Sequence, residues 1–162
     1  PDEPTADTDI SSQQHYFQAL LAKETVTLSD LYTMLAILIG IDTTYPDFAA
    51  QHDFFTQNRI TPRHLAINGQ PHRCPEKDAV AYMFCQVLDI RGGVWMRLFG
   101  VNRRYALKEL VFREIMLPGS PNDTISGAEL IYAITQAADY LREKNITYQI
   151  ESQQAATTNE RP

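Results

Sequence analysis

The sequence lacks long apolar runs and contains little cysteine. The longest apolar run, from Met34 to Ile41, falls well short of the roughly 18 residues that a membrane-spanning helix needs. The two cysteines, Cys74 and Cys85, are 11 residues apart on what we expect to be one helix. That separation corresponds to about 16 Å along a helix, whereas a disulfide requires Cα atoms within roughly 7 Å. We therefore expect no direct membrane insertion and two reduced cysteines.

Positive charge is also scarce. Lys and Arg number 14 against 20 Asp and Glu, which gives a formal net charge of -6 and a pI near 5.1. Nucleic-acid binding needs a basic face that displaces counterions, and docking on an anionic membrane needs clustered basic residues. The composition therefore argues against a nucleic-acid partner and disfavours an anionic membrane surface.

Residue patterns for catalysis or metal binding are missing as well. His52, His64 and His72 match no familiar zinc spacing, and Cys74 is the only thiol near them. A nucleophilic Cys74 would need an oriented base, for which the sequence gives no sign. Ser126 has no G-x-S-x-G context, and no glycine-rich phosphate loop is present. We expect a protein that is not an enzyme and that holds no metal and no cofactor.

The sequence does contain enough apolar residues for one core. Its 162 residues are 44% hydrophobic and 21% charged, which is typical of a single globular domain. The ends are polar, so we expect a flexible leader at 1–10, one helical repeat domain at 11–150 and a disordered tail at 151–162. The chain begins at Pro1 without an initiator methionine, so we also expect a processed or trimmed product.

Apolar residues recur at helical spacing through most of the chain and predict an all-α fold. The six expected helices cover about 12–23, 27–40, 46–58, 75–91, 103–116 and 126–141. Segment 61–73 contains Pro62, Gly69 and Pro71, so we expect an irregular loop there. The alternating segment Ile146–Ile150 predicts an extended packing segment.

Two long segments share one layout, in which an aromatic residue and an alanine start a helix, a Gly/Pro loop follows, and a capped helix comes next. A compressed third copy opens the chain. The capped helix of the second long segment starts with a capping box, in which the side chains of Ser126 and Glu129 each bond the other's backbone amide. The aromatic starts are Tyr16-Phe17, Phe48-Ala49 and Tyr105-Ala106, and the capped starts are Thr27-Leu28-Ser29-Asp30, Pro75-Glu76-Lys77-Asp78 and Ser126-Gly127-Ala128-Glu129.

This layout, which spans Tyr16 to Leu141, resembles S-layer homology repeats. In that family an aromatic-Ala pair starts one helix and a Thr-Arg-Ala-Glu motif opens the next. The resemblance implies a pseudo-threefold helical prism of about three helix–loop–helix repeats. It also implies a non-catalytic binding or scaffolding module in the bacterial cell envelope or periplasm, with carbohydrate binding to a cell-wall glycan or protein binding to another envelope protein.

The motif departs from the family at one position. The family grips pyruvylated wall polysaccharide with the Arg of its Thr-Arg-Ala-Glu motif. At that position the third copy has Gly127, the first has Leu28 or Ser29, and the second has Glu76 or Lys77. Since no copy has an Arg, the alternative is a protein–protein adaptor that keeps the fold without glycan binding.

The candidate binding residues gather around the start of the fifth expected helix, where the sequence is also similar to an uncharacterised envelope-associated type of bacterial protein. They are Trp95, Arg97, Arg103, Arg104 and Tyr105. Arginine donates two parallel hydrogen bonds to a carboxylate, and aromatic rings stack on sugars. Two alternatives stay open: the arginines bind an acidic group or they pair with Glu109 or Glu114, and the aromatic residues form a contact surface or fill the core.

Overall fold

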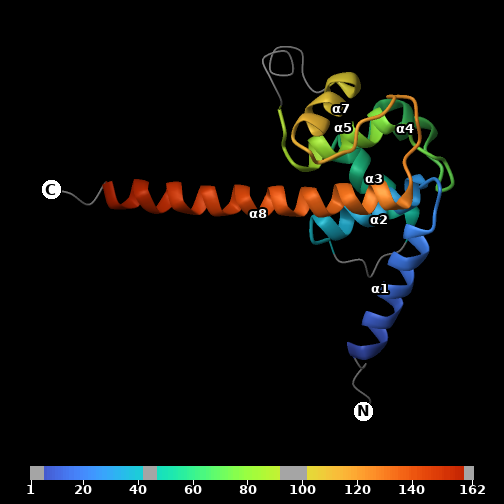
Figure 1. Cartoon of the computed structure of the whole chain (residues 1–162), viewed down its shortest axis with the longest axis horizontal. Helices are drawn as coiled ribbons and strands as arrows, with labels where there is room; N and C mark the ends of the chain where they lie inside the picture. The colour runs from blue at the N-terminus through green and yellow to red at the C-terminus, as the bar shows by residue number, and fades with distance from the viewer. Residues whose placement is uncertain (1–5, 42–46, 92–101, 159–162) are drawn as a thin grey trace.

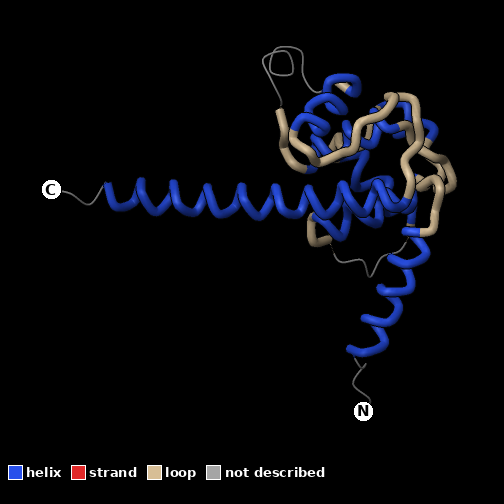
Figure 2. Tube along the Cα trace, in the orientation of Figure 1, coloured by secondary structure: helices blue, strands red, loops and turns tan. Residues whose placement is uncertain are grey.

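Helices account for all the regular secondary structure in the described part of the chain. The computed structural model describes the backbone of residues 6–41, 47–91 and 102–158, and the side chains of 13–41, 47–91 and 102–145. No strand occurs in these ranges, as Figure 2 shows, so the all-α prediction is confirmed. The helices are α1 (Ala6–Leu21), α2 (Leu28–Leu38), α3 (Phe48–Gln57), α4 (Arg63–Asn68), α5 (Lys77–Val87), α7 (Arg103–Phe112) and α8 (Gly127–Thr158).

The helices form a packed body from which two of them project (Figure 1). Within the body α5 packs on α7, and α2 contacts α3, α5 and α8. α1 contacts α8 and leaves the body in its own direction, while the C-terminal half of α8 extends beyond it. The start of α1 and the end of α8 therefore both lie away from the core.

The core is built from the apolar faces of the body helices. Leu28, Leu31 and Leu35 recur at intervals of three and four residues, which places them on one face of α2, and all three are fully buried. On the same helix the buried Tyr32 ring stacks on Phe55 of α3 with a centroid distance of 4.9 Å. Each such side chain contributes about 1.5–3 kcal/mol by leaving water.

Four helices end with the same hydrogen-bonded turn. After α2, α3, α5 and α7, a residue with positive φ is followed by an isoleucine whose amide donates to the carbonyl five residues back. The pairs are Gly40–Ile41, Arg59–Ile60, Asp89–Ile90 and Glu114–Ile115, with φ of 70°, 58°, 51° and 60° at the first residue. This Schellman turn costs a non-glycine residue about 1–2 kcal/mol of left-handed strain. The isoleucine packs on the core each time, so its burial offsets that cost.

Capping boxes start two of the helices. The Ser126 amide donates to Glu129 Oε2 at 2.9 Å, and the Glu129 amide donates to Ser126 Oγ at 3.2 Å, which confirms the predicted box at α8. Thr27 and Asp30 form the matching pair of bonds at the start of α2. These bonds satisfy amides that would otherwise have no intrahelical partner.

Three backbone hydrogen bonds join the helix starts in a ring. The amide of Leu28, at the start of α2, donates to the Arg73 carbonyl at 2.7 Å, in the loop before α5. The amide of Lys77, at the start of α5, donates to the Asp123 carbonyl at 2.6 Å, in the loop before α8. The amide of Gly127, at the start of α8, donates to the Lys23 carbonyl at 2.9 Å, in the loop before α2. The starts of α2, α5 and α8 are therefore each bound by the loop that precedes another of these three helices.

Two expectations about secondary structure are wrong. Segment 61–73 contains α4, because Pro62 lies at the N-cap, where a missing amide proton costs nothing, and the helix ends before Gly69. The expected extended segment Ile146–Ile150 lies within α8. A lone strand has no partner for its backbone groups, whereas continuing a helix adds one hydrogen bond per residue.

The helix limits differ from the expected leader and tail. α1 begins at Ala6, inside the leader, and the backbone of α8 continues to Thr158, inside the tail. The division of the chain into a leader, a domain and a tail stays a prediction.

Both cysteines are free, as expected, but not for the expected reason. Cys74 lies in the loop before α5, which begins at Lys77, so the two cysteines are not on one helix. Cys85 is buried in α5, and burial raises the pKa of its thiol to about 12. The Cys85 side chain therefore acts as a small apolar packing group.

Candidate functional site

Three of the five residues that the sequence groups into one site lie in the described part of the chain. Trp95 and Arg97 lie outside the described residues. Arg103, Arg104 and Tyr105 form the first turn of α7, after Asn102, whose side chain accepts from the Arg104 amide. Consecutive residues of a helix point in different directions, and these three side chains do not line one common groove.

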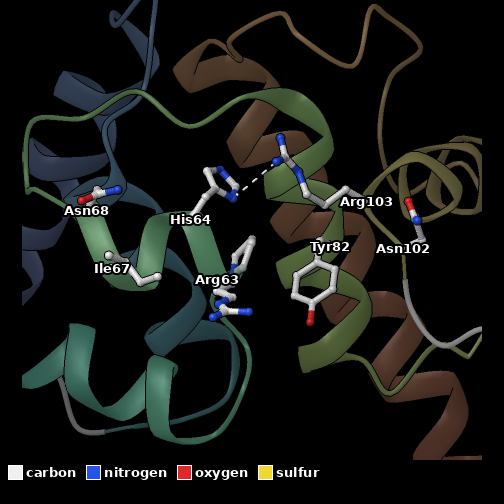
Figure 3. Close-up of a pocket in the computed structure, with 8 residues that line it drawn as sticks. Arg63, His64, Ile67, Asn68, Tyr82, Asn102 and Arg103 are labelled. Atoms are coloured by element: carbon white, nitrogen blue, oxygen red, sulfur yellow. Dashed lines mark hydrogen bonds between the residues drawn. The ribbon is translucent and has the colours of Figure 1, made fainter.

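Arg103 lines a groove that we name the α4–α5–α7 groove (Figure 3). Its volume is about 650 Å³, within the range of natural ligand pockets. The residues that line it are Pro62, Arg63, His64, Ile67, Asn68, Tyr82, Asn102 and Arg103. They come from α4 and its N-cap, from α5, and from the start of α7.

Ion pairs hold Arg103 in place. Its Nη2 atom donates to Asp78 Oδ1 at 2.6 Å and to Glu76 Oε2 at 3.3 Å. Both acids belong to the start of α5, so this contact fixes α7 against α5. The expected alternative of pairing with Glu109 or Glu114 is therefore wrong for Arg103; Glu109 instead pairs with Arg113 at 2.7 Å.

His64 forms the second part of the same cluster, as Figure 3 shows. Arg103 Nη1 donates to His64 Nδ1 at 3.3 Å, which requires an unprotonated Nδ1. Burial lowers the pKa of His64, the Arg103 guanidinium lowers it further, and Glu76 opposes both. The neutral ring is thus favoured, and its Nε2 atom lies 3.5 Å from Glu76 Oε2 without a hydrogen bond.

The remaining lining residues offer binding chemistry. Arg63 is exposed and has no ion pair among the described side chains, so its guanidinium is available to a ligand. Tyr82 contributes an aromatic face, and Asn68 and Asn102 contribute amides that donate and accept. A polar ligand with a carboxylate or phosphate group matches this combination.

Arg104 lines a second groove on another face of α7, between that helix and the loop that contains Pro118 and Pro121. Tyr105 lines neither groove, and 42% of its surface is exposed. Arg103 therefore lines one groove, Arg104 lines the other, and Tyr105 lines neither.

The first residues of α2, α5 and α8 are all buried. Leu28, Lys77 and Gly127 are the first residues of α2, α5 and α8. Lys77 is only 4% exposed, and its Nζ atom donates to Glu129 Oε1 at 2.8 Å. A Cβ atom on Gly127 would lie 1.6 Å from the Leu20 carbonyl oxygen, so no side chain fits there. None of the three positions presents a free cation.

The sequence pattern does not identify Arg63, Asn68 or Tyr82 as residues of the α4–α5–α7 groove, and it suggests His64 only as a metal ligand. Among the residues searched, no three His, Cys, Asp or Glu side chains gather to hold a metal. No described helix is both long enough and apolar enough to cross a bilayer.

The comparisons add no relative. The chain matches no family model, and no curated protein and no solved structure matches it. Any function must therefore be argued from the grooves and the fold.

Proposed function

We propose that this chain is a non-catalytic binding or scaffolding module of the bacterial cell envelope, and that its α4–α5–α7 groove binds an acidic glycan. The observation that carries the proposal is the exposed, unpaired Arg63 in a groove whose other cation, Arg103, is already held by acids. A ligand carboxylate meets a free guanidinium there, and Tyr82 offers a face for a sugar ring.

In this proposal the fold is a pseudo-threefold helical prism of three S-layer-homology-like repeats, α1–α2, α3–α5 and α7–α8. The ring of backbone bonds supports it, because each bond joins equivalent positions. The donor is always the first residue of a helix, and the acceptor always lies three or four residues before the next N-cap. The Schellman turn with isoleucine follows the first helices α3 and α7 and the second helices α2 and α5 of these repeats, which agrees with the repeats without marking one position in them.

Sedimentation with purified bacterial cell walls tests the glycan proposal. We expect the protein to sediment with intact walls and to stay in solution with walls stripped of their acidic secondary polymers. Arg63→Glu should weaken this binding by about tenfold or more, because it replaces the free cation with a charge that repels the ligand. Arg142→Glu is the matched control, since Arg142 is exposed on α8 and does not line the groove.

Two results would contradict the proposal: equal sedimentation of wild type and Arg63→Glu, or no sedimentation of the wild type. Arg103 is unsuitable for this test. A glutamate at 103 would face Asp78 and Glu76, so a loss of binding would be confounded with a loss of stability.

A protein–protein adaptor without glycan binding is the second candidate. It is favoured by the motif positions Leu28, Lys77 and Gly127, which hold no arginine and are all buried. For an adaptor we expect no retention on cell walls, with or without acidic polymers, and retention of a protein partner instead.

A further inference from the structure

The second groove, which we name the α7–Pro118 groove, has a volume of about 400 Å³. One wall is α7, and the other is the loop that precedes α8. The lining residues are Arg104, Leu107, Lys108, Val111, Phe112, Pro118, Gly119 and Pro121. It shares no lining residue with the α4–α5–α7 groove.

Apolar surface at this groove is exposed to an unusual degree. Phe112, at the end of α7, is 85% exposed, the largest exposed fraction among the large apolar residues of the described chain. Leu117, next to Pro118, is 42% exposed. Two large apolar side chains beside a groove are typical of a contact surface.

The charge of the groove is opposite to that of the whole chain. Arg104 and Lys108 lie one helical turn apart, and neither has an ion pair among the described side chains. No acid lines the groove. Of the acids in the neighbouring segments, Glu129 pairs with Lys77, Glu109 pairs with Arg113, and Asp123 accepts from the Ser120 amide, while the exposed Glu114 does not line the groove.

The loop wall is held by the start of α5. Lys77 Nζ donates to the Pro118 carbonyl at 3.3 Å, and the Asp78 amide donates to the Pro121 carbonyl at 3.1 Å. A Cβ atom on Gly119 would lie 2.8 Å from Lys77 Nζ, so the loop packs closely on that lysine. The groove is thus formed before any ligand binds, which lowers the entropic cost of binding.

From these observations we infer that the α7–Pro118 groove docks an acidic peptide segment of another protein, with apolar side chains entering the groove and carboxylates meeting Arg104 and Lys108. Charge complementarity selects this occupant, because two free cations flank an apolar floor in a chain of net charge -6. An anionic membrane fits less well, since each basic residue adds only about 1 kcal/mol there and the net negative charge of the chain opposes approach. This inference does not depend on glycan binding.

Selection from a random peptide library displayed on phage tests the inference. We expect the wild-type protein to enrich peptides that combine acidic residues with leucine or aromatic residues. A synthetic peptide of the enriched sequence should then bind in fluorescence polarisation. Arg104→Glu with Lys108→Glu should weaken that binding by about tenfold or more, and Phe112→Ser by a similar factor, because truncation of a central anchor has such effects.

The matched control is Arg91→Glu with Arg142→Glu, which changes the net charge equally at exposed positions outside both grooves. It should leave peptide binding unchanged, and so should Arg63→Glu, which keeps this test separate from the glycan test. The inference is overturned if no peptide is enriched, if enriched peptides lack acids, or if the Arg104/Lys108 variant binds them as tightly as wild type. The groove would be assigned to a lipid surface instead if no peptide is enriched, if wild type and the control variants bind phosphatidylglycerol vesicles, and if the Arg104/Lys108 variant does not.

Discussion

At the scale of single residues, buried charges fix how the helix starts meet. Asp30 is only 7% exposed, yet it accepts from Lys23 through both carboxylate oxygens, at 2.8 and 2.7 Å, and from the amide and hydroxyl of Thr27. Burial alone would raise the pKa of this carboxyl group, but the bonds from Lys23 and Thr27 outweigh burial and hold the pKa below its ordinary value of 3.8. The ionised form therefore stabilises the fold.

The lowered pKa predicts a loss of stability in acid. The contribution of Asp30 is present above pH 3.8, the ordinary pKa, and is lost as the pH falls through the lower pKa of the folded state. Asp30→Asn should lower the free energy of unfolding at pH 7 by about 2 kcal/mol, less than for a fully buried pair because Lys23 is partly exposed. Urea unfolding midpoints between pH 7 and pH 2 measure the change.

The difference between wild type and Asp30→Asn should shrink toward the acidic end of that range. Asp53→Asn, an exposed change on α3, is the control and should move the midpoint little at any pH. A wild type and an Asp30 variant of equal stability at pH 7 would show that the Lys23 contact contributes nothing net.

At the scale of helices, local signals and tertiary contacts can be told apart. The starts of α2 and α8 follow from Thr27 and Ser126, because a capping box involves only neighbouring residues. The sequence pattern does not predict α4, because Pro62 and Gly69 are typical of loops, although the same two residues also bound a short helix. The ion pairs of Arg103 could not be predicted, since Asp78 is 25 residues away and meets it only when α7 packs on α5.

The capping box at α8 gives a prediction at this scale. Ser126→Ala removes the oxygen that accepts from the Glu129 amide, and it should lower the free energy of unfolding by about 1 kcal/mol. The midpoint of thermal or urea unfolding measures the loss. Thr124→Ala, two residues earlier and exposed, is the control and should be close to neutral. An unchanged midpoint for Ser126→Ala would show that water replaces the cap at no cost.

At the scale of the whole molecule, the ring of backbone bonds ties the first helices of the chain to the last one. The apolar pattern predicts the helices, but it does not predict that α8 approaches the end of α1 closely. This approach is possible because Gly127 has no side chain. The Gly127 amide donates to Lys23, and the neighbouring Val26 amide donates to Ile125 at 2.9 Å. The glycine at 127 therefore allows the start of α8 to contact the end of α1. A larger side chain, such as arginine, would fit at 127 only if α1 and α8 moved apart.

Gly127→Ala tests whether the junction holds the molecule together. The added Cβ would lie 1.6 Å from the Leu20 carbonyl oxygen, which is backbone and cannot rotate away, so α1 and the start of α8 must separate. We expect a loss of about 3 kcal/mol or more in the free energy of unfolding, at the upper end for overpacking. Hydrogen exchange should accelerate at the amides of Gly127 and Val26, while the amides of α5 keep their protection. Gly40→Ala is the matched control, because nothing lies within 4 Å of its Cβ and only its φ of +70° is strained, which should cost about 1–2 kcal/mol. If Gly127→Ala costs no more than Gly40→Ala, then the contact between α1 and α8 yields easily and the ring does not hold the fold together.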